Sequence, residues 1–181
     1  MRNIIVANAN IENAKKIGSV LKSAGILVSA VCSTGAQVIH LTSRGYRGGV
    51  VICSVKLQDM SAVSLPKMAG EGYEFLYVAR GQTAIELEYP CLFQPLSRVC
   101  LIASVTMLQR MHEGSSLNLS NRIQSCGMDE KQIIERAKQV LTHRCNMPEP
   151  AAHRFLQKRS MNSGKKLCET AMLVLETLGS V

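Results

Sequence analysis

Aspartate is scarce in this sequence, although the chain has 181 residues and 13 of them are acidic. The two aspartates are Asp59 and Asp129, and every other acid is a glutamate. Acidic magnesium pockets, aspartyl dyads and calcium loops of the usual kind are built from clustered aspartates. The sequence therefore excludes sites of these kinds.

Other absences narrow the class of protein further. No apolar run approaches the ~20 residues that cross a membrane, and the first residues, MRNIIVANAN, lack the apolar stretch of a secretory signal. The seven cysteines include no CxxC pair, and the four histidines show no metal-ligand spacing with them. We therefore expect reduced core thiols in a cytoplasmic protein without metal, cofactor or membrane contact.

Catalytic signatures are also missing. No nucleophile, paired carboxylates or phosphate-binding glycine loop stands out, and the G-x-G in AGEGYEF precedes a strand, which is the wrong context. We therefore do not expect an enzyme and assign no catalytic residue.

Residues 1–112 alternate short apolar runs with helical patterns. Strands are expected at 4–6, 26–32, 48–55, 75–80 and 91–95, and helices at 11–21, 35–45 and 97–111. Strands separated by helical segments need crossover connections, as in parallel sheets. The pattern predicts an α/β domain with a doubly wound, five-stranded parallel sheet.

Residues 113–127 are rich in Ser, Asn and Gly, so we expect a linker there. Residues 128–181 then follow a purely helical pattern, which MPEP and MNSG interrupt. Asp129 suits a helix cap, Pro148 or Pro150 suits the first turn of a second helix, and Asn162 and Gly164 mark its end. A small domain of three helices is therefore expected at 128–181.

Positive charge is concentrated in these helices. The chain carries a net charge of +8, and residues 136–166 hold eight Lys and Arg but one acid, Glu149. This favours a polyanionic partner, although a solvated basic face is the ordinary alternative. Phe155 is the only aromatic residue after Phe93. If nucleic acid binds, Arg planes, His143 or His153 have to supply the stacking.

Two segments of the helical part carry a recurring pattern, IIERAKQVLT from Ile133 and PEPAAHRFL from Pro148. The positions on the pattern are Ala137, Lys138, Leu141, Glu149, Ala152 and Leu156. With them, the segment resembles the ANTAR domain, the RNA-binding module of AmiR- and NasR-type transcription antiterminators. Gln139, Thr142 and Ser160 depart from the family pattern. The resemblance implies a homodimer that binds hairpin loops in structured leader RNA.

Charge and placement suggest which side chains contact this RNA. The expected contacts are Lys138, Arg144, Arg154, Lys158, Lys165 and Lys166, with His153 and Arg159 as second choices. Lys165 and Lys166 stand at the start of the last helix, where the helix dipole disfavours a cation unless an anion is present.

A second motif, SVKLQDM, follows the third expected strand. It makes residues 1–112 resemble a response-regulator receiver domain, in which this strand ends at the phosphoacceptor aspartate. Here Ser54 occupies that position, and Asp59 is a loop residue.

The other pocket positions are neutral as well. Asn8, with Asn10 behind it, stands where receivers carry an acidic pair, Gln94 replaces the lysine, and Ala79 replaces the switch Ser or Thr. Phosphoryl transfer to a receiver needs a carboxylate nucleophile, Mg²⁺ and a lysine. We therefore expect a pseudo-receiver that cannot accept a phosphoryl group on aspartate.

The leading hypothesis is an RNA-binding transcription antitermination regulator, with a regulatory partner protein as one substitute for phosphorylation. A protein-interaction adaptor that has lost RNA binding is the first alternative. A DNA-binding regulator is the second, since three short helices also describe a helix-turn-helix unit. The MPEP turn differs from the short, glycine-containing turn of that motif.

Overall fold

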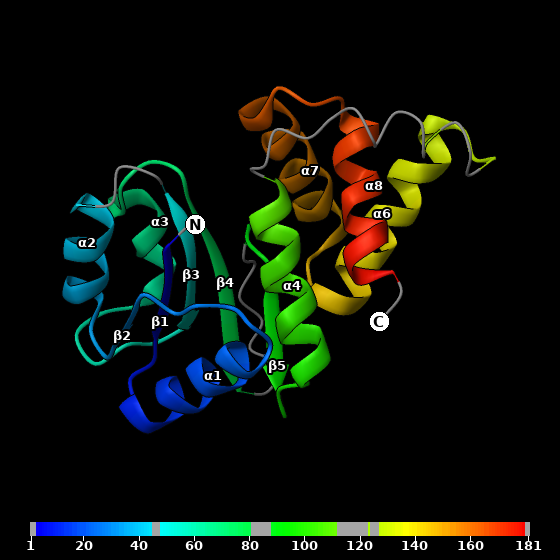
Figure 1. Ribbon diagram of the computed structural model, residues 1–181. Helices are drawn as coiled ribbons and strands as arrows, with labels where there is room; N and C mark the ends of the chain where they lie inside the picture. The colour runs from blue at the N-terminus through cyan, green and yellow to red at the C-terminus, as the bar shows by residue number, and fades with distance from the viewer. Residues whose placement is uncertain (1–2, 45–47, 81–87, 112–122, 124–126, 180–181) are drawn as a thin grey trace. The chain divides into compact units, whose positions relative to one another are not determined.

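The computed structural model describes residues 3–44, 48–80, 88–111, 123 and 127–179 (Figure 1). The chain divides into two compact units, one of residues 1–83 and 93–98, the other of residues 84–92 and 99–181. The expected linker, residues 113–127, lies outside the described residues apart from Ile123 and Gly127. The domain boundaries drawn from the sequence therefore stay a prediction.

One parallel sheet dominates the first part of the chain. Its strands are β1 (Asn3–Ala7), β2 (Ala30–Cys32), β3 (Gly49–Ser54), β4 (Tyr73–Arg80) and β5 (Cys91–Gln94). They are ordered β2-β1-β3-β4-β5, with parallel pairing of β1 to β2 and β3 and of β3 to β4. The predicted α/β fold with a five-stranded parallel sheet is confirmed.

Helices connect β1 to β2, β2 to β3 and β3 to β4, as parallel pairing requires. They are α1 (Ile11–Ser23), α2 (Gly35–Arg44), the 3₁₀ turn η1 (Ala62–Ser64) and the short α3 (Leu65–Met68). The apolar residues of α1 recur at spacings of three and four, and Ala14, Ile17 and Leu21 are buried, whereas Ile11 in the first turn is 37% exposed. Gly25 follows this helix with a φ of +77°, a left-handed conformation that glycine adopts without a Cβ clash.

Two local expectations were wrong. Strand β2 is shorter than the predicted 26–32, and the N–H of Ile26 instead donates to the carbonyl of Leu21 at the end of α1 (3.0 Å). The segment η1–α3 was not predicted. Its four-residue helix is too short to show a helical periodicity in the sequence.

The second compact unit contains four described helices. They are α4 (Arg98–Met111), which joins this unit from Val99 on, α6 (Glu130–Cys145), α7 (Glu149–Ser163) and α8 (Leu167–Leu178). Helix α6 buries one stripe of residues four apart: Ile133, Ala137, Leu141 and Cys145. Helix α8 is buried over most of its length, as expected for the central helix of a small core.

The ends of these helices follow local sequence signals. Asp129 and Gln132 form a capping box at the start of α6, with hydrogen bonds of 2.7 and 3.2 Å. Pro150 lies in the first turn of α7, as predicted. Asn162 was expected to break this helix but lies within it. The helix ends at Gly164, whose φ of +65° stops the helical repeat.

None of the described helices is both long and apolar enough to cross a bilayer. Six cysteines are described: Cys32, Cys53, Cys91, Cys100, Cys145 and Cys168. Five of them are buried, as expected for core thiols, and half-buried Cys100 is the exception.

Candidate nucleic-acid interface and receiver edge

The carboxyl ends of parallel strands form one edge of a sheet, where ligands bind in folds of this type. Ser54 is the last residue of β3, and Asn8 directly follows β1. The hydroxyl of Ser54 donates to the carbonyl of Lys56 (2.7 Å) and accepts from the N–H of Ala9 (3.4 Å). Serine at this position is thus held by backbone groups.

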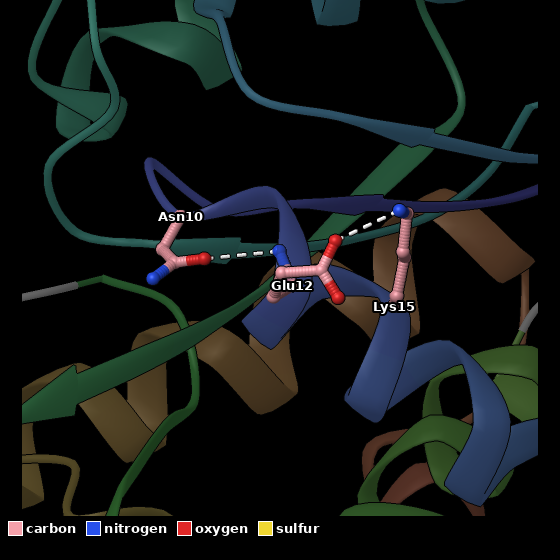
Figure 2. Close-up of polar contacts among 3 residues, drawn as sticks. All are labelled: Asn10, Glu12 and Lys15. Atoms are coloured by element: carbon pink, nitrogen blue, oxygen red, sulfur yellow. Dashed lines mark hydrogen bonds and ion pairs between the residues drawn. The ribbon is translucent and has the colours of Figure 1, made fainter.

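The two asparagines after β1 serve the backbone. The side-chain oxygen of Asn8, which is buried, accepts from the N–H of Asn10 (3.0 Å). Asn10 caps α1 by accepting from the N–H of Glu12 (2.9 Å), and Lys15 pairs with Glu12 at 2.8 Å, as Figure 2 shows. The hydrogen bond from Lys15 lowers the pKa of Glu12. Asn10 is therefore a helix cap.

Gln94 ends β5, and its side-chain oxygen accepts from Nε of Arg80 (3.1 Å), the last residue of β4. Ala79 precedes Arg80 and is 5% exposed. The positions to which the receiver resemblance assigns a lysine and a hydroxyl thus hold a neutral amide, Gln94, and a buried methyl group, Ala79.

Both aspartates bond backbone N–H groups at helix starts. Asp59 accepts from the N–H groups of Gly35 (2.7 Å) and Ala36 (3.0 Å) at the start of α2, and these bonds lower its pKa. Asp129 caps α6. Each of the two aspartates of the chain therefore bonds the start of a helix.

Burial divides the predicted RNA contacts. His153 is half-buried. Four of the others, which we call the exposed cations, reach solvent: Arg144, Arg154, Lys158 and Lys166. The remaining three, the buried cations, are at most 9% exposed: Lys138, Arg159 and Lys165. Residues that the sequence treats as equivalent thus have different environments.

Lys138 lies between two glutamates. Its ammonium is 2.7 Å from Glu135, on the same helix, and 3.0 Å from Glu149, at the start of α7. Hydrogen bonds to Glu135 and then to Glu149 raise the pKa of Lys138. This lysine, which matches the family pattern, therefore links α6 to α7.

Arg159 and Lys165 are packed inside the helical unit. The guanidinium of Arg159 lies 5.0 Å from the ring centre of Phe155, and burial lowers its pKa to about 9, so it stays protonated at neutral pH. The ammonium of Lys165 is 3.5 Å from the carbonyl oxygen of Arg110 on α4. Both charges are thus engaged within the protein.

Lys166 is the N-cap of α8 and is exposed. Its backbone N–H donates to the carboxylate of Glu169 (3.0 Å), which is buried in the first turn. The carboxylate of Glu169 therefore already supplies an anion at the start of α8, where the sequence suggested an external one.

A hollow of about 300 Å³ lies along α7. Arg154, Lys158, Arg159 and Met161 line it from the helix, and Tyr89 lines it from the segment before β5. The ammonium of Lys158 is 5.7 Å from the ring centre of Tyr89. The sequence-based reasoning did not identify Tyr89, since nothing in EYP distinguishes it from other tyrosines.

Comparison with known proteins matches both parts of the chain. Residues 127–175 match the family model of the ANTAR domain. The transcriptional regulatory protein PdtaR of Mycobacterium tuberculosis is 30% identical over 104 residues, which are 57% of this chain and 50% of PdtaR. The chain thus spans about half the length of the curated relatives it matches.

Solved structures resemble the chain in fold. A response regulator receiver protein from Sinorhizobium medicae WSM419 aligns with a TM-score of 0.52 at 24% identity, over 60% of this chain and 94% of its own. The RcsB response regulator of Salmonella typhimurium aligns over 100% of both chains, with a TM-score of 0.51 and 12% identity. At these identities the likeness shows the fold alone.

Proposed function

We propose that this chain, whose residues 127–175 match the ANTAR domain and whose parallel sheet has the receiver fold, is an RNA-binding transcription antitermination regulator. Its ANTAR domain binds hairpin loops in nascent leader RNA. The observation that carries this proposal is the coincidence of the family match at 127–175 with the four exposed cations, all of which lie in that segment.

The mechanism is a competition between RNA structures. A terminator and an alternative hairpin use overlapping RNA, and a protein that binds one of them stabilises it by mass action. Unpaired loops present the base edges that proteins read, and phosphates attract Lys and Arg. The exposed cations supply that attraction, while Lys138 and the other buried cations hold the helices together.

The receiver unit does not accept a phosphoryl group on aspartate. Ser54 and Gln94 are neutral and already hydrogen-bonded, and both aspartates cap helices. A signal other than phosphorylation therefore controls the protein, and a regulatory partner protein is the source that we propose. Homodimerisation and a cytoplasmic location, where leader transcripts are made, follow from the resemblance.

The test starts from the full-length protein and a library of RNA hairpins with randomised loops. We expect the protein to enrich a hairpin class. A variant in which all four exposed cations are replaced by alanine should bind the enriched hairpins weaker by on the order of a hundredfold at ~100 mM salt, since about four phosphate contacts are lost.

A charge-matched control replaces four other surface Lys and Arg residues, all in the first compact unit, by alanine: Lys16, Lys22, Arg44 and Lys67. This control should bind RNA as the parent protein does. If the parent enriches no hairpin, the adaptor alternative replaces the proposed function. If the control loses as much affinity as the test variant, RNA binding is not located on the exposed cations.

A further inference from the structure

The hollow beside α7 combines an aromatic ring with positive charge. Tyr89 is half-buried and lines one side, and Phe155 lies on the helix. Three cations line it, Arg154, Lys158 and Arg159, against a single carboxylate, Glu88. An aromatic surface within a net positive pocket suits a ligand that has both a planar ring and a negative charge.

The positive charge of the hollow comes from one buried and two exposed side chains of α7. Arg159 is 5% exposed and is protonated at neutral pH, since its pKa is about 9. Arg154 and Lys158 are one turn apart on α7 and both are exposed. The long side chain of Lys158 allows its ammonium to leave the face of Tyr89 for a phosphate while the ring stays in place.

Size and hydrogen-bonding groups limit the ligand. A volume of about 300 Å³ is at the lower end of the range for small-molecule pockets, so the site takes one nucleotide-sized group at a time. The amides of Gln157 and Asn162 also line the hollow. Each offers donors and an acceptor, which is what the edge of a nucleobase requires.

We propose that this hollow binds one unstacked nucleotide of the RNA, with its base against Tyr89 and its phosphate on Arg154 and Lys158. The inference rests on the proposed function and deepens it. Bases within a paired stem are stacked on each other, whereas loop bases are free to turn outward, so the bound nucleotide comes from the loop. Tyr89 thus contributes the stacking surface that residues 128–181 lack.

The experiment uses the full-length protein and the hairpins enriched from the randomised-loop library. Tyr89→Ala should weaken binding by about 5- to 150-fold, the range that corresponds to the loss of one base–aromatic stack. Tyr89→Phe keeps the ring and should stay within about twofold. Thermal unfolding of both variants checks that the fold is retained.

A second readout reports stacking directly. The fluorescent base 2-aminopurine is placed at each loop position in turn, since stacking on an aromatic ring quenches its emission. One position should be quenched on binding by the parent protein and by Tyr89→Phe, and should stay bright with Tyr89→Ala. Lys158→Ala should reduce the log–log salt slope by about 0.7, the value for one phosphate of a single strand. The control for a general charge effect is Lys131→Ala, which removes a surface lysine of α6 that does not line the hollow.

The outcomes separate the two proposals. If the parent binds the enriched hairpins and Tyr89→Ala binds them equally well, with no loop position whose quenching depends on Tyr89, the nucleotide site is wrong and the proposed function stands. If the parent enriches no hairpin, both fail. Loss of binding in both Tyr89→Ala and Tyr89→Phe also overturns the site, because a stacking role requires only the ring.

Discussion

The salt dependence of RNA binding tests whether only the exposed cations, and none of the buried cations, contact the RNA. The sequence alone offers seven Lys and Arg as contacts, but three of these are at most 9% exposed and are engaged within the protein. We therefore expect four phosphate contacts for each protomer, one from each exposed cation. The perturbation is added KCl, which competes with these contacts by restoring counterions to the RNA.

The expected magnitude follows from this number. Each phosphate contact contributes about −0.7 for single-stranded and −0.9 for duplex nucleic acid to the slope of log K against log salt. Four contacts give a slope of about −2.8 to −3.6, so raising KCl from ~50 to ~200 mM weakens binding about 50- to 150-fold. Seven contacts give a slope of about −5 to −6 and a loss of about 900- to 6,000-fold.

Fluorescence anisotropy with one labelled hairpin measures the slope. Single replacements of Arg144 or Lys166 by alanine should each reduce it by about 0.7 to 0.9. Replacing Lys165 should leave the slope unchanged in protein that remains folded, since its ammonium faces the carbonyl oxygen of Arg110. A slope near −6 in the parent protein would refute this reasoning, because the buried cations would then have to reach the RNA.

Three further predictions follow from the structure. Incubation with acetyl phosphate and Mg²⁺ should leave the intact mass unchanged, also in Ser54→Asp, because the other pocket positions stay neutral; a phosphate-sized increase contradicts the pseudo-receiver. Leu141→Ala, at a site that is 0% exposed, should lower the free energy of unfolding by about 2–5 kcal/mol in chemical denaturation. Val99→Ala, at a site that is 57% exposed, should change it by less than about 0.5 kcal/mol, and equal effects would disprove the packing. Burial raises the pKa of Cys145 to about 12, so at pH 8 iodoacetamide should modify half-buried Cys100 before Cys145, which should react only after unfolding, and mass spectrometry of the labelled peptides checks this order.

Much of the fold was predictable because its signals are local. The buried face of α1 at Ala14, Ile17 and Leu21 follows from spacings of three and four, and Asp129 is a cap residue beside its own helix, so both signals involve neighbours in sequence. The length of β2 was not predictable in this way. It depends on which residues pair with β1, a contact between distant segments. It also depends on Ile26, whose N–H bonds the end of α1 and not a neighbouring strand.

The candidate site also has features that the sequence predicts and features that it does not. The sequence by itself predicts which chemistry is missing: with aspartate confined to two positions and Ser54 at the end of the third strand, we expect no phosphoacceptor aspartate there. It also determined that the positive charge lies in the last helices. Identity and order of residues are enough for both conclusions.

Only the tertiary structure decided which charges are available and what lies beside them. Lys138 is turned inward where α6 meets α7, and Lys165 faces Arg110, which is 55 residues away, whereas Arg154 and Lys158 remain at the surface. The structure also brings Tyr89 next to α7, and no sequence pattern links the two. Exposure and proximity are set by packing, and for this reason the folded unit has an accessible aromatic ring, Tyr89, although the one aromatic residue of the helical sequence, Phe155, is buried.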